Sequence, residues 1–265
     1  MAKLEELSAE QVQLEWDTPL FRTAQKQFEQ AIPHAQVNES IVERLRYPER
    51  AVVVTSPTKP AIAEFLAARP LDRLTTAVVV QPEPRGLGDA ITCARAVVGT
   101  DHVAVMLPDN LFRASYPMRP VLDAHRRTGR PVVLLAEIHA RDAATKGPTG
   151  PARCRLRSDG LYDVLAVASK RPGAERFDPG NGPSALTTIG RMAFDGSVFD
   201  LFDSQRRGLA PGAELDDVPV LQALARSNRL VGVVLADDFF DAGIPEGYRA
   251  ALAAHGGGGV DLSPL

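Results

Sequence analysis

The sequence has few cysteines, no long apolar run and no large excess of one charge. Its two cysteines, Cys93 and Cys154, form no CxxC pair and join no histidine cluster, which argues against a disulfide framework or a zinc site. No stretch approaches the ~20 apolar residues that a membrane-spanning helix needs, and the acidic start MAKLEELSAEQVQLEW has no leader pattern. We therefore expect a cytoplasmic protein without a membrane partner.

Charge is nearly balanced along the chain. Against 30 lysines and arginines stand 33 aspartates and glutamates, which gives a formal charge of −3. Nothing in this balance favours a nucleic-acid partner, because binding a phosphate backbone needs an excess of basic side chains. A smaller anionic ligand would need a bound cation, a lysine or backbone N–H groups at its binding site to offset its negative charge.

Glycine is absent from residues 1–85 and first occurs at Gly86. The first 50 residues are rich in Glu, Gln and Arg, with a stripe of apolar residues at helical spacing: Leu20, Phe21, Ala24 and Phe28. They predict a helical extension over residues 1–50, whose apolar stripe would bury against another subunit. At the other end, residues 254–265 include HGGGGVDLSPL and predict a flexible tail.

From residue 51 the sequence alternates between short β-branched runs and helical segments. The predicted strands are 51–55, 76–80, 103–107, 132–137, 186–194 and 229–236, and the predicted helices are 61–68, 89–99 and 120–129. Asp89 is a candidate N-cap, while Gly99 and Gly129 are candidate helix ends. This alternation predicts an α/β domain over residues 51–253, with a mostly parallel (mixed) sheet flanked by helices.

RGLGDA (85–90) follows a predicted strand and opens a predicted helix, as a dinucleotide-binding turn does. The third glycine of that fingerprint is Ile91 here, which argues against an NAD site. A second interpretation is a turn whose Gly86 and Gly88 let a flat base approach, while the Gln81 amide reads the edge of the base. A tight turn without a ligand is the remaining alternative.

Two acidic turns follow predicted strands. Asp109 comes directly after VAVML, where open α/β sheets place their ligands, and could hold Mg²⁺ or merely form a turn. Asp241 lies in FFDAGIPEGY, and its neighbours Asp237 and Asp238 are equally acidic. The residues alone therefore do not show which of Asp237, Asp238 and Asp241 would hold a metal ion.

Taken in order, these motifs resemble the bacterial UTP–glucose-1-phosphate uridylyltransferases and the wider family of sugar-phosphate nucleotidyltransferases over residues 51–253. The similar pairs are QPEPRGLGDA with EPLGLGHA, MLPDN with LLPDD, ASKRP with VEKP, ALTTIGRMAF and VFDLF with NLAIVGRYVL and IFDLL, and FDAGIPEGY with YDCGxxxGY. The resemblance implies a Rossmann-like nucleotidyltransferase fold, also called the nucleotide-diphospho-sugar transferase fold.

The resemblance also implies roles for individual residues. Asp109 and Asp241 would hold Mg²⁺, and Lys170 would offset charge on the sugar phosphate, so Lys170 and Asp109 are the expected catalytic residues. The residues expected to bind the nucleotide are Gln81, Gly86 and Gly88, and Gly190 is expected to contact the sugar-phosphate substrate beside Lys170. The implied reaction converts UTP and glucose-1-phosphate to UDP-glucose and pyrophosphate.

The sequence also departs from the family pattern. The family's GxGTRxxPxTKxxPK loop, which cradles a triphosphate, has no counterpart in residues 1–50, and Ser169 stands where the family has a sugar-binding glutamate. Three hypotheses stay open: an active uridylyltransferase, a catalytically degenerate relative reused for binding, regulation or assembly, and a metal-dependent glycosyltransferase. The absent loop is the main argument against the first.

Residues 17–54 weakly resemble the N-terminal segment of bacterial glutamate dehydrogenases. The similar stretches are DTPLFRTAQKQFEQA and NESIVERLRYPERAVVV, and none of that family's catalytic motifs accompanies them. Because that segment contributes to subunit assembly in those enzymes, the resemblance implies a homo-oligomer rather than amino-acid oxidation. A chance likeness between helical sequences is the alternative.

Overall fold

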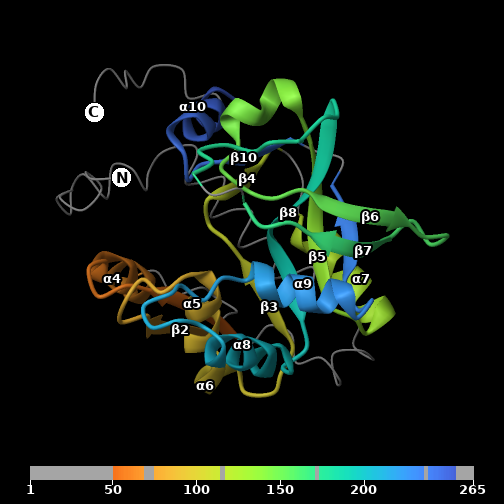
Figure 1. Cartoon of the computed structure of the whole chain (residues 1–265). Coiled ribbons are helices and arrows are strands. Elements are labelled where there is room, and N and C mark those ends of the chain that lie inside the picture. The colour runs from red at the N-terminus through yellow and green to blue at the C-terminus, as the bar shows by residue number, and fades with distance from the viewer. Residues whose placement is uncertain (1–49, 69–74, 114–116, 171–172, 236–237, 255–265) are drawn as a thin grey trace.

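The computed structural model describes residues 50–68, 75–113, 117–170, 173–235 and 238–254 of the chain (Figure 1). The predicted helical extension and flexible tail therefore lie outside the described residues, apart from Arg50 and Ala254. Both stay predictions. The described part is a mixed α/β structure in which helices flank a central sheet, as the sequence predicts.

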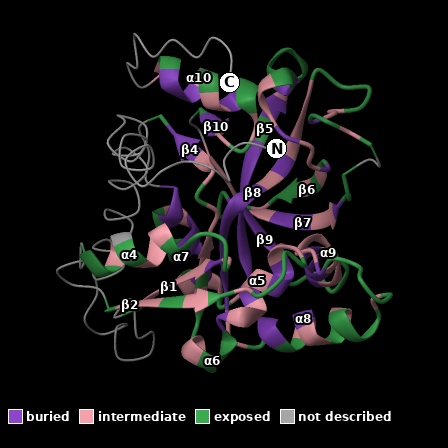
Figure 2. Cartoon of the chain, turned by 90° about the vertical axis from the view of Figure 1, so that its left-hand side faces the viewer, coloured by how far each residue is buried: buried purple, intermediate pink, exposed green. Residues whose placement is uncertain are grey.

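The central sheet has six strands in the order β3-β8-β5-β9-β7-β6. In that order the strands are β3 (Val103–Met106), β8 (Ser184–Phe194), β5 (Val132–His139), β9 (Val231–Val234), β7 (Tyr162–Val167) and β6 (Ala152–Leu156). The longest of them, β8, pairs with β5 over the full length of β5, with a bulge between Val133 and Leu134. These two strands therefore form the buried centre of the sheet (Figure 2).

Strand direction differs from the expected mostly parallel arrangement. Within the central sheet β5 and β9 are parallel, whereas β3–β8, β5–β8, β6–β7 and β7–β9 are antiparallel. Repeating strand–helix crossovers would make neighbouring strands parallel, but here β6 and β7 form a hairpin and β8 runs back between β3 and β5. The sheet is mixed, as predicted, with antiparallel pairs in the majority among the described strands.

Apolar side chains of β5 pack on both faces of the sheet. Successive side chains of a strand point to opposite faces, and Val132, Leu134, Ala136 and Ile138 join one core cluster while Val133 and Leu135 join another. The first cluster includes buried residues of α7 (Met118–Thr128), and the second includes buried residues of α8 (Val198–Arg207) and α9 (Val218–Arg226). This double burial explains why β5 is an almost uninterrupted apolar run.

The helix that follows the glycine turn begins earlier than predicted and is interrupted. It forms α5 (Leu87–Cys93) and α6 (Arg95–Val98), and its N-cap is Gly86 rather than Asp89, which lies in the first turn. The predicted stops hold, since Gly99 (φ 69°) ends α6 and Gly129 (φ 62°) ends α7. Glycine suits both positions because other residues are strained at positive φ.

Two small sheets accompany the central one. In the first, β1 (Arg50–Thr55) and β2 (Thr75–Val80) are parallel, and α4 (Pro60–Ala68) lies between them in the chain. In the second, β4 (Asn110–Phe112) pairs antiparallel with β10 (Phe239–Asp241), which leads into α10 (Pro245–Ala254). A hydrogen bond of 2.6 Å from Arg50 Nη1 to Val97 O ties β1 to α6.

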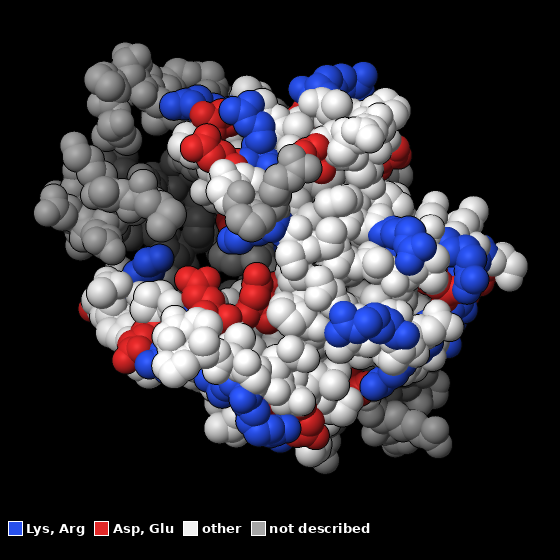
Figure 3. Space-filling model, in the orientation of Figure 1, with Lys and Arg blue, Asp and Glu red and all other residues white. Residues whose placement is uncertain are grey.

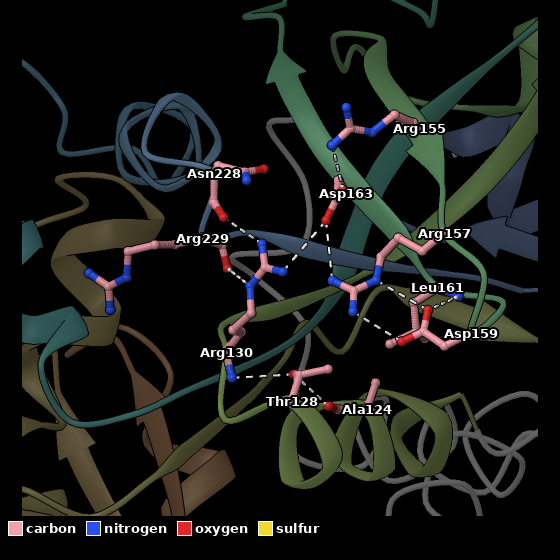
Figure 4. A network of polar contacts seen from close by, with 10 residues as sticks. All are labelled: Ala124, Thr128, Arg130, Arg155, Arg157, Asp159, Leu161, Asp163, Asn228 and Arg229. Atoms are coloured by element: carbon pink, nitrogen blue, oxygen red, sulfur yellow. Dashed lines mark hydrogen bonds and ion pairs between the residues drawn. The ribbon is translucent and has the colours of Figure 1, made fainter.

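Charged groups hold the β6–β7 hairpin against the loop after α7 (Figure 4). The buried Asp163 carboxylate contacts Arg155 Nη2 at 2.9 Å, Arg157 Nη1 at 3.2 Å and Arg130 Nη1 at 3.5 Å. Hydrogen bonds from Arg155 and Arg157 hold the pKa of Asp163 below its ordinary value. The network therefore fixes the far end of the sheet around one ionised carboxylate.

The surface carries both signs of charge. On the face shown in Figure 3, lysines and arginines alternate with aspartates, glutamates and uncharged groups. None of the helices in the described ranges combines the length and the apolar character that crossing a membrane needs.

Candidate functional site

Asp109 and Asp241 lie beside each other, although they are far apart in the sequence. Asp109 directly precedes β4 and Asp241 ends β10, and these two strands pair so that Asn110 faces Asp241. The amide of Ala242 donates to Asp109 O at 2.7 Å. A Cβ added to Gly243 would lie 2.9 Å from Asp109 Oδ2 and 3.1 Å from Asp241 Oδ1, so both carboxylates border the same glycine.

Backbone amides hold the Asp241 carboxylate in place. Gly147 N donates to Oδ2 at 2.7 Å and Gly243 N donates to Oδ1 at 3.1 Å. A Cβ on Gly147 would lie only 2.5 Å from Oδ2, which explains why glycine is needed there. The orientation of Asp241 is therefore set by main chain from two different loops.

The surroundings of Asp109 disfavour the ionised form of its carboxyl group. Burial and, to a lesser extent, the neighbouring charge of Asp241 raise the pKa of Asp109, while Arg191 acts in the opposite direction. Its carboxylate Oδ1 accepts a long hydrogen bond from Asn110 Nδ2 at 3.2 Å, and main-chain hydrogen bonds at Asp109 and Asn110 act to lower its pKa. Two carboxylates that raise each other's energy are stabilised when a cation lies between them.

Arg191 supports this region from inside the sheet. It is 4% exposed, and burial lowers its pKa to about 10. Its Nη1 donates to Leu107 O and Gly190 O, and its Nη2 donates to Asn110 O. The guanidinium therefore fixes the loop that carries Asp109, and among the described residues its Nε has no hydrogen-bond partner.

Gly190 belongs to the same framework. Its amide donates to Asn110 Oδ1 at 2.7 Å, and an added Cβ would lie 2.5 Å from Leu107 Cβ. The structure thus gives Gly190 a packing role next to the Asp109 loop. Its predicted contact with a substrate stays a prediction.

The donor set fits a divalent cation of the magnesium type. Mg²⁺ takes oxygen ligands, commonly one or two carboxylates completed by water and substrate phosphates. Asp109 and Asp241 supply two such carboxylates at one edge of the fold, and no group of three or more His, Cys, Asp or Glu within the described ranges offers a richer metal site. The site therefore suits an ion shared with a phosphate ligand.

The predicted nucleotide-binding residues form a second cluster at the end of β2. Gln81 follows β2, and its Nε2 donates to Gly86 O at 3.2 Å and to Asp89 Oδ2 at 2.8 Å. Gly86 has a φ of 94°, and a Cβ there would lie 2.5 Å from Leu215 O. A Cβ on Gly88 would lie 2.8 Å from the Phe202 ring.

The two glycines of this turn are therefore explained by packing. Leu215 O accepts hydrogen bonds from Gly88 N at 2.8 Å and Asp89 N at 3.3 Å, and Leu215 N donates to Arg85 O at 2.8 Å. These hydrogen bonds join the turn to the loop that precedes α9. A nucleotide role for Gly86 and Gly88 is compatible with this packing and stays a prediction.

Lys170 is exposed and lies beyond the end of β7. Within the described part of the chain no hydrogen bond or ion pair connects it to Asp109, Asp241 or Gln81. The neighbouring Ser169 Oγ accepts a hydrogen bond from Gln222 Nε2 at 3.3 Å. The structure brings Asp109, Asp241 and Gly190 into one framework and Gln81, Gly86 and Gly88 into another, and it leaves Lys170 outside both.

The sequence motifs did not single out three residues that matter here. Arg191 is the one charged residue in the predicted strand 186–194, which was an available signal. Asp89, a candidate helix cap by sequence, lies in the first turn of α5 and accepts a hydrogen bond from Gln81. Lys146 donates to Phe239 O and lies 4.1 Å from the centre of the Phe239 ring, and burial lowers its pKa.

Comparison with solved structures defines the class of fold. The chain superposes on a UDP-glucose pyrophosphorylase complexed with UDP-glucose with a TM-score of 0.66 and 20% identity, covering 85% of this chain and 86% of that one. For the UTP-bound UGPase from Acinetobacter baumannii the TM-score is 0.60 at 20% identity, with 81% and 79% covered. The described structure therefore has the nucleotidyltransferase fold of these proteins, as the sequence predicts.

No family model matches the chain. Similar sequences, however, belong to proteins named for one particular reaction. The chain is 28% identical over 170 residues to the UTP–glucose-1-phosphate uridylyltransferase of Bacillus subtilis (strain 168), which covers 63% of this chain and 54% of that protein. With the protein of the same name from Streptococcus pyogenes it is 26% identical over 183 residues, covering 66% and 57%. The chain thus spans little more than half the length of these relatives, and by sequence and fold it is similar to sugar-1-phosphate nucleotidyltransferases.

Proposed function

We propose that the chain is a sugar-1-phosphate nucleotidyltransferase-like protein, with UTP and glucose-1-phosphate as substrates and UDP-glucose and pyrophosphate as products. The observation that carries the proposal is the juxtaposition of Asp109 and Asp241 across β4 and β10. The choice of substrates follows the names of the similar proteins. The fold alone would not specify a reaction.

In the proposed reaction an oxygen of the sugar phosphate attacks the α-phosphorus of UTP. A new P–O bond forms as the bond between the α-phosphorus and its bridging oxygen breaks, and pyrophosphate leaves. Bound Mg²⁺ would supply charge neutralisation for the phosphates. Asp109 and Asp241 would hold the ion, Lys170 would offset charge on the sugar phosphate, and the protein would act mainly by positioning.

The remaining predicted residues would bind the substrates. Gln81 would read the base, with Gly86 and Gly88 shaping the turn that receives it, and Gly190 would border the sugar phosphate. Support comes from the position of Gln81 at the carboxyl end of β2, since open α/β sheets bind ligands at that edge.

One observation favours a second candidate, a catalytically degenerate relative reused for binding, regulation or assembly. Residues 1–85 contain no glycine, so the chain before Gly86 holds no glycine-rich loop for a triphosphate. Each lost hydrogen bond to a charged phosphate would weaken binding by about 1.5–3 kcal/mol. This candidate predicts the same fold and carboxylate pair with little or no turnover.

Pyrophosphate release separates the two candidates. The protein is incubated with UTP, glucose-1-phosphate and Mg²⁺, with Asp109→Ala as the inactive control and Arg207→Gln as a matched surface control. Release that Asp109→Ala abolishes would contradict the degenerate candidate. No release with several nucleoside triphosphates and sugar phosphates, together with no thermal shift from UTP and Mg²⁺, would contradict the enzyme.

We also propose that residues 1–50 support a homo-oligomer. The proposal rests on the apolar stripe in their sequence, which would bury against another subunit. Light-scattering mass of the chain with and without residues 1–50 tests it. An unchanged mass would remove the assembly role.

A further inference from the structure

The side-chain amide of Gln81 has its orientation fixed by two acceptors. Its Nε2 donates to Gly86 O and to Asp89 Oδ2, at 3.2 Å and 2.8 Å. A carbonyl and a carboxylate oxygen both accept hydrogen bonds, so the NH₂ group must face them and the amide cannot be reversed without opposing two oxygens. The carbonyl Oε1 therefore points the other way, and no hydrogen bond within the described ranges uses it.

Asp89 is itself held firmly. It is 7% exposed, and its Oδ1 accepts from Arg206 Nη1 at 2.7 Å. Arg206 Nη2 donates to Thr92 Oγ1 at 2.6 Å, and Thr92 Oγ1 donates to Asp89 O at 2.8 Å. The backbone N–H of Asp89 also donates to Leu215 O. With its carboxylate divided between Arg206 and Gln81, Asp89 has little freedom to rotate.

We infer that Asp89, held by Arg206, is a positioning residue that makes Gln81 an acceptor-only contact and so selects bases with an imide N–H. Uracil and thymine present such a donor at N3, whereas cytosine presents a lone pair there, which would oppose Gln81 Oε1. A site built to accept a hydrogen bond rejects a ligand that lacks the donor, because its own acceptor is left unpaired. This inference rests on the proposed function, in which this turn receives the base.

Asp89→Asn is the informative substitution. An asparagine that accepts from Arg206 through its oxygen would turn its NH₂ toward the NH₂ of Gln81. The amide of Gln81 would then be driven to reverse against Gly86 O or to move freely, and both results weaken the preference for an N–H donor. The matched control is Asp203→Asn, because Asp203 pairs with Arg95 and has no contact with Gln81.

Calorimetric titration with UTP and with CTP, each with Mg²⁺, tests the selection. The two probes share the sugar and the triphosphate and differ in the base. We expect the wild type and Asp203→Asn to bind UTP roughly tenfold or more tightly than CTP, and the ratio to fall toward one in Asp89→Asn. An unchanged ratio in Asp89→Asn, or a wild type that prefers CTP, would overturn the inference.

A second readout needs no nucleotide. In ¹⁵N-labelled protein the Gln81 side-chain NH₂ signals, assigned by their loss in Gln81→Leu, should move in Asp89→Asn and stay in place in Asp203→Asn. Unmoved signals in Asp89→Asn would overturn the positioning role whatever the protein binds. If those signals move but neither UTP nor CTP binds the wild type, the positioning role is retained, and the proposed function and the base selection built on it are both contradicted.

Discussion

The Asp241 carboxylate and the Gln81 amide are held by different kinds of contact. Main chain fixes Asp241, through amides of Gly147 and Gly243 and the pairing of β4 with β10. The Gln81 amide is fixed by Gly86 O and by side chains, those of Asp89 and the half-exposed Arg206. We therefore expect the position of Asp241 to depend on backbone packing, whereas loss of the Asp89 or Arg206 side-chain contacts should change the ligand preference of the turn more than its stability.

The largest effect is expected from Gly247→Ala. An added Cβ would overlap Asp241 O and lie 2.8 Å from Thr145 O, and backbone atoms cannot move aside as a flexible side chain can. We expect the free energy of unfolding to fall by about 1–3 kcal/mol or more, with weaker cation binding.

Urea unfolding measures this loss, with Gly208→Ala as the control. Its Cβ would meet Gln205 O at 3.5 Å, an ordinary contact. Equal stability of Gly247→Ala and Gly208→Ala would contradict the view that backbone packing sets the position of Asp241.

The two carboxylates should respond differently to substitution. Asp241→Ala leaves the buried Gly147 N–H without its acceptor, which should destabilise the fold by about 1–3 kcal/mol. Asp109→Asn removes a partly buried charge whose pKa is raised by burial, so the free energy of unfolding should change by less than about 1 kcal/mol or increase. Thermal unfolding without divalent cations compares them, and a larger loss for Asp109→Asn would reverse the expected order.

The pH dependence of stability should follow the raised pKa of Asp109. A carboxyl with a higher pKa in the folded than in the unfolded chain binds more protons when folded, so its ionisation destabilises the fold as pH rises through the folded pKa. Below the unfolded pKa of about 4 this penalty is absent. We expect any advantage of Asp109→Asn over the wild type at about pH 8 to shrink toward about pH 4 in urea titrations, and a constant difference would contradict it.

The smallest effect on stability is expected in the turn. Arg206 pairs with Asp89, but its side chain is 43% exposed, and exposed ion pairs contribute about 0–1 kcal/mol. Arg206→Gln should therefore unfold within about 1 kcal/mol of Arg207→Gln, its exposed neighbour. A loss of several kcal/mol would show that the turn belongs to the rigid part of the molecule.

The elements were predictable because their signals are local. Apolar runs such as 51–55, 103–107 and 132–137 became β1, β3 and β5, and Gly99 and Gly129 end helices as expected. Strand direction was not predictable in the same way, because the pattern along β8 is the same whichever way the strand runs. Its antiparallel pairing with β3 and β5 is decided by contacts distant in the sequence.

Contacts distant in the sequence also decide the positions of the site residues, which the sequence therefore could not fully predict. Asp237, Asp238 and Asp241 could not be ranked from the residues, and the resemblance selected Asp241. The pairing of β10 with β4 supplies the physical reason, since it brings Asp241 beside Asp109. The contact of Gln81 with Asp89 could not be predicted either, because it depends on how α5 and α8 pack and on where Arg206 reaches.

The claim that Asp109 and Asp241 hold one divalent cation between them is tested most directly by calorimetric titration with Mg²⁺ in the presence of UTP. Asp109→Asn and Asp241→Asn are compared with the wild type and with Asp238→Asn, a neighbouring carboxylate that pairs with Arg113. We predict that both site variants bind Mg²⁺ at least roughly tenfold more weakly than the wild type and Asp238→Asn. Wild-type affinity in Asp109→Asn or in Asp241→Asn would contradict the shared site.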